Sequence, residues 1–255
     1  MNAPITKNAI VRPVPDSYDH CVRTNVETID IALARKQHAE YCKVLKRLGL
    51  KLVWVKKANN LPDSCFVEDT AVILGEKAVI CNMSVKSRAK EVIEVAKVLE
   101  ELKETHYIKS PATIDGGDVL KIEDKIFVGL SARTNLEATQ QLRKILEDTA
   151  FEVVPVKIRD VLHLKSACTY LGYKYVILAK RHFNMTLLRD LKKIVVPKGE
   201  EYAADCLAIN GTILIAKGYP RTEKLVEKEG FSVETLEMSE FHKGEGALTC
   251  LSIVW

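Results

Sequence analysis

Four short polar stretches interrupt the apolar segments of the chain, and their side chains are suited to nucleophilic and acid–base chemistry. They are residues 61–69 (LPDSCFVED), 115–118 (DGGD), 163–166 (HLKS) and 244–250 (GEGALTC). Together they supply carboxylates, an imidazole and a thiol, from which a nucleophile, a general base and an orienting acid can be assembled. If they meet in one pocket, they indicate a hydrolytic or transfer reaction on a polar substrate.

Each stretch also has a structural explanation when it is considered alone. A cysteine is more often a small core residue than a nucleophile, and a lone histidine such as His163 is more often structural than catalytic. Paired glycines permit tight turns as readily as close approach to a ligand. The functional interpretation therefore depends on all four stretches converging.

The composition excludes several classes of protein. Apolar residues make up 47% of the 255-residue chain and charged residues 28%, as in ordinary globular proteins. The net charge of +4 is mild, and no basic block with interleaved aromatic residues indicates nucleic acid as a partner. No apolar run reaches the ~18 residues of a membrane span, and residues 1–14 lack the pattern of a signal peptide.

The seven cysteines are scattered singly, with no CxxC pair that would indicate a zinc or redox site. We therefore expect reduced thiols, a cytoplasmic protein, and no metal or other cofactor.

Hairpin-like segments recur along the chain. In each, two β-rich runs flank a turn that contains Gly, Asn or Asp, and the Asn210-Gly211 turn is the strongest of these signals. A segment of helical periodicity and another β-rich run follow every hairpin. The hairpins are residues 71–80, 119–130, 168–179 and 206–216; the segments with helical periodicity are residues 86–104, 135–148, 183–193 and 220–229, with a further one at 30–48.

The hairpin turns repeat at intervals of roughly 40–50 residues, which is typical of a circular array. A fifth unit has no internal hairpin, so its strands must come from residues 9–11 and 249–254, and this pairing of the chain ends closes the ring. The sequence therefore predicts an α/β fold, a five-bladed α/β propeller forming one domain over residues 1–255. A doubly wound α/β sheet is the alternative, but parallel sheets join their strands through helices rather than hairpins.

The motifs FVED (66–69), DGGDV (115–119), SARTN (131–135), HLKS (163–166) and ALTCLS (247–252) occur in this order. With them the chain resembles the guanidino-group-modifying, or pentein, superfamily, and in particular the dimethylarginine dimethylaminohydrolase (dimethylargininase) family. The similarity runs from about Ile10 to the C-terminus. The fold of that family is also a five-bladed propeller.

The resemblance implies a role for each matching residue. Cys250 is the implied nucleophile at the guanidinium carbon. His163 protonates the departing amine and then activates water, and Asp115 orients this histidine. Asp69 accepts hydrogen bonds from the guanidinium group, with Glu68 beside it.

The resemblance also implies residues for the other end of the substrate. Arg88 and Arg133 match ligands of an α-carboxylate, and Asp63 matches the ligand of an α-amino group. Phe66 and Gly244 complete the implied substrate-binding set, and the loop near Val22 and Arg23 closes over the ligand. The expected partner is thus a small guanidino amino acid, and a homodimer is a further expectation.

Three functions remain open at this stage. The first is hydrolysis of Nω-methylated arginine to citrulline and a methylamine, through a thiouronium intermediate on the cysteine. The second is arginine deimination, although deiminases carry a second guanidine-binding Asp two residues after the His, where this chain has Lys165. The third is a non-catalytic propeller that serves as a binding surface, because fold alone does not decide function. Asp205 is a further departure, since relatives usually have Asn there.

Overall fold

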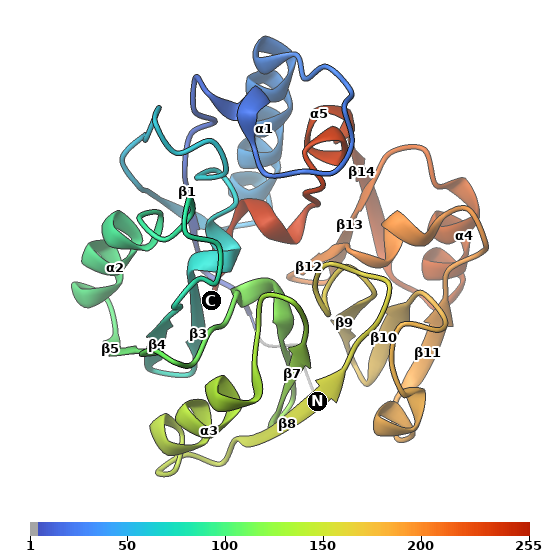
Figure 1. Cartoon of the computed structure of the whole chain (residues 1–255). Helices are drawn as coiled ribbons and strands as arrows, with labels where there is room; N and C mark the ends of the chain where they lie inside the picture. The colour runs from blue at the N-terminus through green and yellow to red at the C-terminus, as the bar shows by residue number, and fades with distance from the viewer. Residues whose placement is uncertain (1–4) are drawn as a thin grey trace.

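The computed structural model describes residues 5–255, in which five three-stranded sheets are arranged in a ring (Figure 1). Four sheets contain an antiparallel hairpin whose second strand pairs in parallel with a third strand. In chain order these sheets are β3 (Ala71–Leu74), β4 (Lys77–Ile80) and β5 (Glu104–Tyr107); β6 (Val119–Ile122), β7 (Lys125–Leu130) and β8 (Glu152–Lys157); β9 (Cys168–Gly172), β10 (Tyr175–Leu178) and β11 (Lys192–Val195); and β12 (Leu207–Ile209), β13 (Thr212–Ala216) and β14 (Ser232–Leu236).

The fifth sheet joins the two ends of the chain. Strand β1 (Asn8–Val11) pairs antiparallel with β15 (Ile253–Val254) and parallel with β2 (Lys51–Trp54). This arrangement confirms the predicted five-bladed propeller, including its closure by the chain ends, which leaves no gap in the ring. A doubly wound fold would instead place its strands in one continuous sheet, so that alternative is wrong.

Local sequence signals account for most of the elements. Asn210 and Gly211 both have positive φ angles, 48° and 89°, and form the tight turn between β12 and β13. Helices make the crossovers between the parallel strands of four of the five sheets. They are α1 (Ile31–Arg47), α2 (Val92–Glu100), α3 (Leu136–Ile145) and α4 (Pro220–Lys228). Asp30 and Asn135 cap α1 and α3 by accepting hydrogen bonds from backbone N–H groups of the first turn.

Two local predictions were wrong. Residues 183–193 were expected to form a helix, but only a 3-10 turn, Met185–Leu188, forms there. Phe183 and Leu188 are the buried apolar residues in that range, and a separation of five positions does not produce a helical stripe. The last predicted strand, 249–254, is divided into the 3-10 turn η6 (Thr249–Leu251) and β15. A short helix, α5 (Ser239–Lys243), was not predicted.

Apolar side chains fill the spaces between neighbouring sheets. One cluster, for example, packs Leu74 and Val79 of one sheet against Val119 and Ile126 of the next. Within residues 5–255, none of the helices has the length and hydropathy needed to cross a bilayer. The interpretation of residues 1–255 as a single domain stays a prediction. Residues 1–4, which also begin the segment tested for a signal peptide, lie outside the described part of the chain.

Candidate active site

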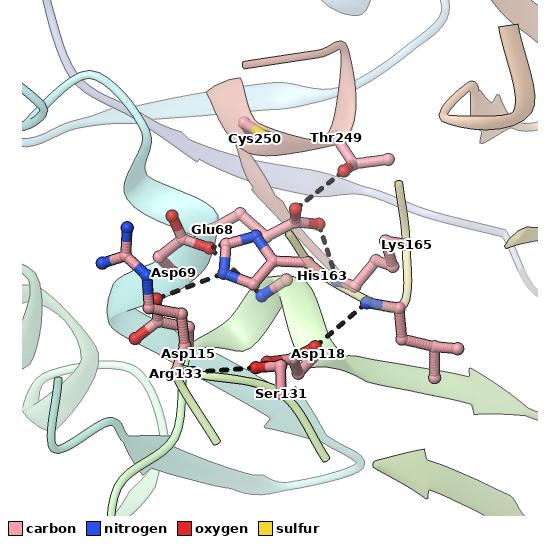
Figure 2. Close-up of polar contacts among 12 residues, drawn as sticks. Glu68, Asp69, Asp115, Asp118, Ser131, Arg133, His163, Lys165, Thr249 and Cys250 are labelled. Carbon is pink, nitrogen blue, oxygen red and sulfur yellow. Dashed lines mark hydrogen bonds and ion pairs between the residues drawn. The ribbon is translucent and has the colours of Figure 1, made fainter. Parts of the chain in front are cut away.

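Three short 3-10 turns bring distant parts of the chain together. They are η2 (Val67–Thr70), η3 (Gly116–Asp118) and η6, and η2 contacts both of the others. His163, in the loop before β9, lies against Asp69 of η2 and Asp115, the residue before η3 (Figure 2). The four polar stretches identified in the sequence therefore meet at one place.

Two cavities meet at this place, and Cys250 and His163 line both of them. The smaller cavity, about 20 Å³, is bordered by all the expected substrate-binding residues except Glu68, namely Asp63, Phe66, Asp69, Arg88, Arg133 and Gly244. The larger cavity, about 450 Å³, is bordered by Glu68, Lys165, Tyr202, Asp205 and His242, among others. The adjacent acids Glu68 and Asp69 thus face different cavities.

His163 lies between two carboxylates. Its Nε2 is 3.2 Å from Asp115 Oδ2, and its Nδ1 is 3.8 Å from Asp69 Oδ1. Burial alone would lower the pKa of His163, but the charge of Asp69 and the hydrogen bond to Asp115 outweigh it and raise the pKa to about 9. At neutral pH the ring is an imidazolium and can donate a proton.

Gly117 makes the close packing of this histidine possible. A Cβ atom at Gly117 would lie 2.7 Å from His163 Nδ1 and 2.9 Å from Asp69 Oδ1. The Gly117 N–H also donates a hydrogen bond to Asp69 Oδ1 at 3.2 Å. Gly117 therefore allows the imidazole and the carboxylate to approach the backbone, and Gly116 allows the backbone at Glu68 to do so.

Asp118 is a positioning residue to which the sequence analysis assigned no role. Its Oδ2 accepts hydrogen bonds from Ser131 Oγ and Thr134 Oγ1, and its Oδ1 accepts one from Leu164 N. The carboxylate thereby ties the SARTN loop to the HLKS loop (Figure 2). A signal was present, because an acid directly before a buried strand needs buried partners.

The thiol of Cys250 is in an environment that disfavours its ionisation. Burial raises the pKa of the Cys250 thiol well above its usual range, and Asp205, Glu68 and Asp69 raise it further. The Ala247 N–H donates to Sγ at 3.4 Å and provides a small opposing effect. A thiolate here needs an additional positive charge nearby.

Arg88 is buried and pairs with two acids. Its Nη1 is 2.8 Å from Asp69 Oδ2, and its other side-chain nitrogens bond to the Glu91 carboxylate. The sequence did not indicate a role for Glu91. It indicated one for Arg88 only through the family resemblance, because an arginine at that position could also be an exposed charge. Arg133 Nη1 is buried and has no hydrogen-bond partner among the described residues. An anion that enters the smaller cavity would accept a hydrogen bond from Arg133 Nη1.

The loop near Val22 covers Asp63. The Val22 N–H donates to both carboxylate oxygens of Asp63, at 3.1 and 3.2 Å. Gly244 lies against Tyr18 and Cys21, which precede Val22 in the same segment, because a Cβ at Gly244 would be 2.3 Å from the Tyr18 phenol oxygen and 3.3 Å from Cys21 Sγ. The loop and the Gly244 backbone therefore enclose the smaller cavity.

Glu68 is engaged on the side of the larger cavity. Its Oε1 is 2.6 Å from Lys165 Nζ, and its Oε2 accepts a hydrogen bond from Thr249 Oγ1 at 2.7 Å. Burial raises the pKa of Glu68, and Lys165 opposes this increase. Both oxygens of Glu68 are thus occupied by protein groups. The oxygens of Asp69 are paired as well, with Arg88 and the Gly117 N–H, but Asp69 borders the smaller cavity.

Asp69, Asp115 and His163 form a group whose ligand-type atoms lie within 4.8 Å of one another. Two carboxylates and an imidazole can bind a divalent cation. In this structure Asp69 and Asp115 face the ring of His163. The ring is a positively charged imidazolium at neutral pH because its pKa is raised. Ion pairing therefore explains the group as well as metal binding would.

Comparisons with known proteins agree with this geometry. The family model described as "N,N dimethylarginine dimethylhydrolase, eukaryotic" matches residues 12–196. The N(G),N(G)-dimethylarginine dimethylaminohydrolase of Streptomyces coelicolor is 36% identical, over 98% of this chain and 97% of that protein.

Two solved structures are also similar. A mutant dimethylarginine dimethylaminohydrolase of Pseudomonas aeruginosa, complexed with citrulline, has a TM-score of 0.94 and 27% identity over 99% of this chain and all of that one. A dimethylarginine dimethylaminohydrolase mutant in an adduct with S-methyl-L-thiocitrulline has a TM-score of 0.95 and 28% identity over 98% of this chain and all of that one.

Proposed function

The chain belongs to the dimethylarginine dimethylaminohydrolase family, and we propose that it hydrolyses Nω-methylated arginine to citrulline and a methylamine through a covalent thiouronium intermediate on Cys250. It is a hydrolase of C–N bonds in linear amidines (EC 3.5.3). The observation that most strongly supports this proposal is the lining of the smaller cavity. Cys250 and His163 border it together with Asp63, Asp69 and the two arginines.

The charges around the smaller cavity match the two ends of the substrate. Asp69 would accept hydrogen bonds from the guanidinium group, and Asp63 from the α-amino group. Arg88 and Arg133 would bind the α-carboxylate, in part through the unpartnered Nη1 of Arg133. For the substrate to bind, the Val22 loop must release Asp63, and Arg88 must share its charge between Asp69 and the incoming carboxylate.

The cationic substrate would activate the nucleophile. Because nearby acids and burial hold Cys250 as a thiol, a guanidinium beside Sγ lowers the cost of losing the proton to solvent. The thiolate then attacks the guanidinium carbon. The imidazolium of His163 gives its proton to the departing methylamine, and the C–N bond breaks.

The same histidine would complete the reaction. Once neutral, His163 takes a proton from a water molecule that attacks the thiouronium carbon. The C–S bond then breaks, the remaining O–H proton of the tetrahedral adduct passes to the departing sulfur, and citrulline and the Cys250 thiol form. His163 returns to the imidazolium that its raised pKa favours at neutral pH, so each turnover ends in the state in which it began.

The arrangement of the two acids supports a preference for methylated substrates. Lys165 and Thr249 occupy both oxygens of Glu68. Asp69 is paired with Arg88 and the Gly117 N–H but borders the smaller cavity, so it is the one acid that would bind the guanidinium there. A methyl group removes hydrogen-bond donors from the substrate, and a second free carboxylate would then be left buried and unpaired, at a cost of roughly 1–3 kcal/mol. A site with one acid avoids this cost.

The proposed function is tested by a competition between asymmetric dimethylarginine and arginine at equal concentration. Citrulline, ammonia and methylamines are quantified separately. We expect a higher kcat/KM for the methylated substrate, with a modest difference because arginine makes the other contacts equally well. Ammonia as the dominant product would instead favour arginine deiminase, and no citrulline from any guanidino compound would favour a binding protein.

Two further proposals concern the location and assembly of the protein. All seven cysteines are free thiols, which suits a reducing compartment, so we propose a cytoplasmic location. A homodimer stays a prediction, which light scattering of the purified protein would test.

A further inference from the structure

Thr249, which immediately precedes Cys250, is held by two buried acids. Glu68 Oε2 accepts a hydrogen bond from its hydroxyl at 2.7 Å. Asp205 Oδ1 accepts one from its backbone N–H at 3.4 Å. Both acids and Cys250 border the larger cavity. The position of the nucleophile and the charge around it therefore depend on the same pair of carboxylates.

A single lysine faces these two acids. Lys165 Nζ bonds directly to Glu68 at 2.6 Å, whereas Asp205 forms no ion pair within residues 5–255. The side chain of Asp205 is nevertheless almost completely buried, with 4% of its surface exposed. A buried carboxylate without its own cation retains a proton to higher pH than an exposed one.

We propose that Asp205 is a positioning residue whose charge controls how readily Cys250 forms its thiolate. A neutral Asp205 accepts the hydrogen bond from the Thr249 backbone without opposing ionisation of the Cys250 thiol. A negatively charged Asp205 opposes that ionisation. The inference rests on the proposed role of Cys250 as the nucleophile. Burial, followed by the charge of Glu68, raises the pKa of Asp205 to about 7, despite its hydrogen bonds with Thr249 and the charge of Lys165. The switch would therefore operate close to neutral pH.

Other groups also face this region and must be held constant in a test. Besides burial and the charge of Asp205, the charges of Glu68 and Asp69 also raise the pKa of the Cys250 thiol. Tyr202 and Cys206 both have raised pKa values, for which burial is the main cause and Asp205 the next. His163 and Lys165 provide the positive charges at the same cavity. Asp205→Asn leaves all of these residues in place.

The test measures the alkylation rate of Cys250 by iodoacetamide between about pH 6 and pH 9, with the modified peptide quantified by mass spectrometry. Wild type, Asp205→Asn and Asp205→Ala are compared. Glu200→Gln is the matched control, because Glu200 and Asp205 flank the same 3-10 turn, Glu201–Ala204, at its start and its end. Glu200 is also a buried acid, but it bonds to Thr222 and Arg221 instead. No turnover is needed, so the result is independent of which substrate the enzyme hydrolyses.

We expect Asp205→Asn and wild type to react at similar rates near pH 6, where Asp205 is protonated. Above about pH 8 the variant should react about tenfold faster, equivalent to a lower thiol pKa by about one unit. Glu200→Gln should follow wild type.

A rate ratio that does not change with pH would overturn the proposal. An effect seen in Asp205→Ala alone would also overturn it, because it would show that the hydrogen bond matters and the charge does not. Asp205→Ser gives the same neutral comparison if the asparagine variant does not fold. Inactivity towards methylarginine with the predicted alkylation profile would refute the proposed function and leave the role of Asp205 intact.

Discussion

Replacing Gly117 with alanine should reduce turnover strongly while the protein stays folded. The new Cβ would lie 2.7 Å from His163 Nδ1 and 2.9 Å from Asp69 Oδ1. Ordinary van der Waals contact begins at 3.4 Å, so the imidazole must move by about 0.7 Å. A misplacement of about 1 Å in an active site can cost about 10²-fold in rate, or about 2.7 kcal/mol in activation free energy.

We therefore expect kcat for methylarginine to decrease by about 10²-fold in Gly117→Ala, as measured by citrulline formation. KM should also rise, because Asp69 is displaced with His163, but by a smaller factor, because the arginines and Asp63 that hold the other end of the substrate are not among the atoms nearest the new methyl group. The melting temperature identifies any general loss of stability.

Gly211→Ala is a suitable control for this experiment. Gly211 has a φ of +89°, so alanine is strained there, but nothing lies within 4 Å of the new Cβ. It should lower stability and leave kcat unchanged. Gly117→Ala with the kinetic constants of wild type would refute the reasoning, since it would mean that the position of His163 does not limit the reaction.

Three other predictions follow from the site. Cys250→Ser should abolish citrulline formation without unfolding the protein, as judged by circular dichroism, and substitution of any of the other six cysteines should not stop the chemistry. His163→Ala should lower kcat by about 10²–10⁴-fold with little change in KM, and a large rise in KM alone would make His163 a binding residue. Because the pKa of His163 rises from its ordinary 6.5 to about 9 on folding, its contribution to stability is full below about pH 6.5 and is lost as the pH rises through 9. Thermal melts of wild type and His163→Asn across this range should converge at alkaline pH.

The sequence by itself determined the repeating architecture. Hairpin turns such as Asn210-Gly211 depend on a few neighbouring residues, so they can be recognised without a structure. Their spacing along the chain was sufficient to predict five units and closure of the ring by the chain ends. Residues 183–193 show the limit of this approach, because their apolar residues suggested a helix that the packing does not support.

The candidate site was only partly predictable. The motifs identified Cys250, His163 and the surrounding acids and arginines as candidates, and the structure brings them together. The roles of Asp118 and Glu91 were missed, because each acts through partners that only the fold brings close. The pairing of Arg88 with both Asp69 and Glu91 is an example.

Only the tertiary structure decided how the charges are divided around Cys250. Glu68 and Asp69 are neighbours in sequence, yet they border different cavities, because the 3-10 turn directs successive side chains to different sides. Glu68 meets Thr249 across 181 residues of sequence and Lys165 across 97. Side-chain pairing over such distances depends on how the blades pack around the axis, and the burial it produces sets the ionisation of the acids, the histidine and the thiol.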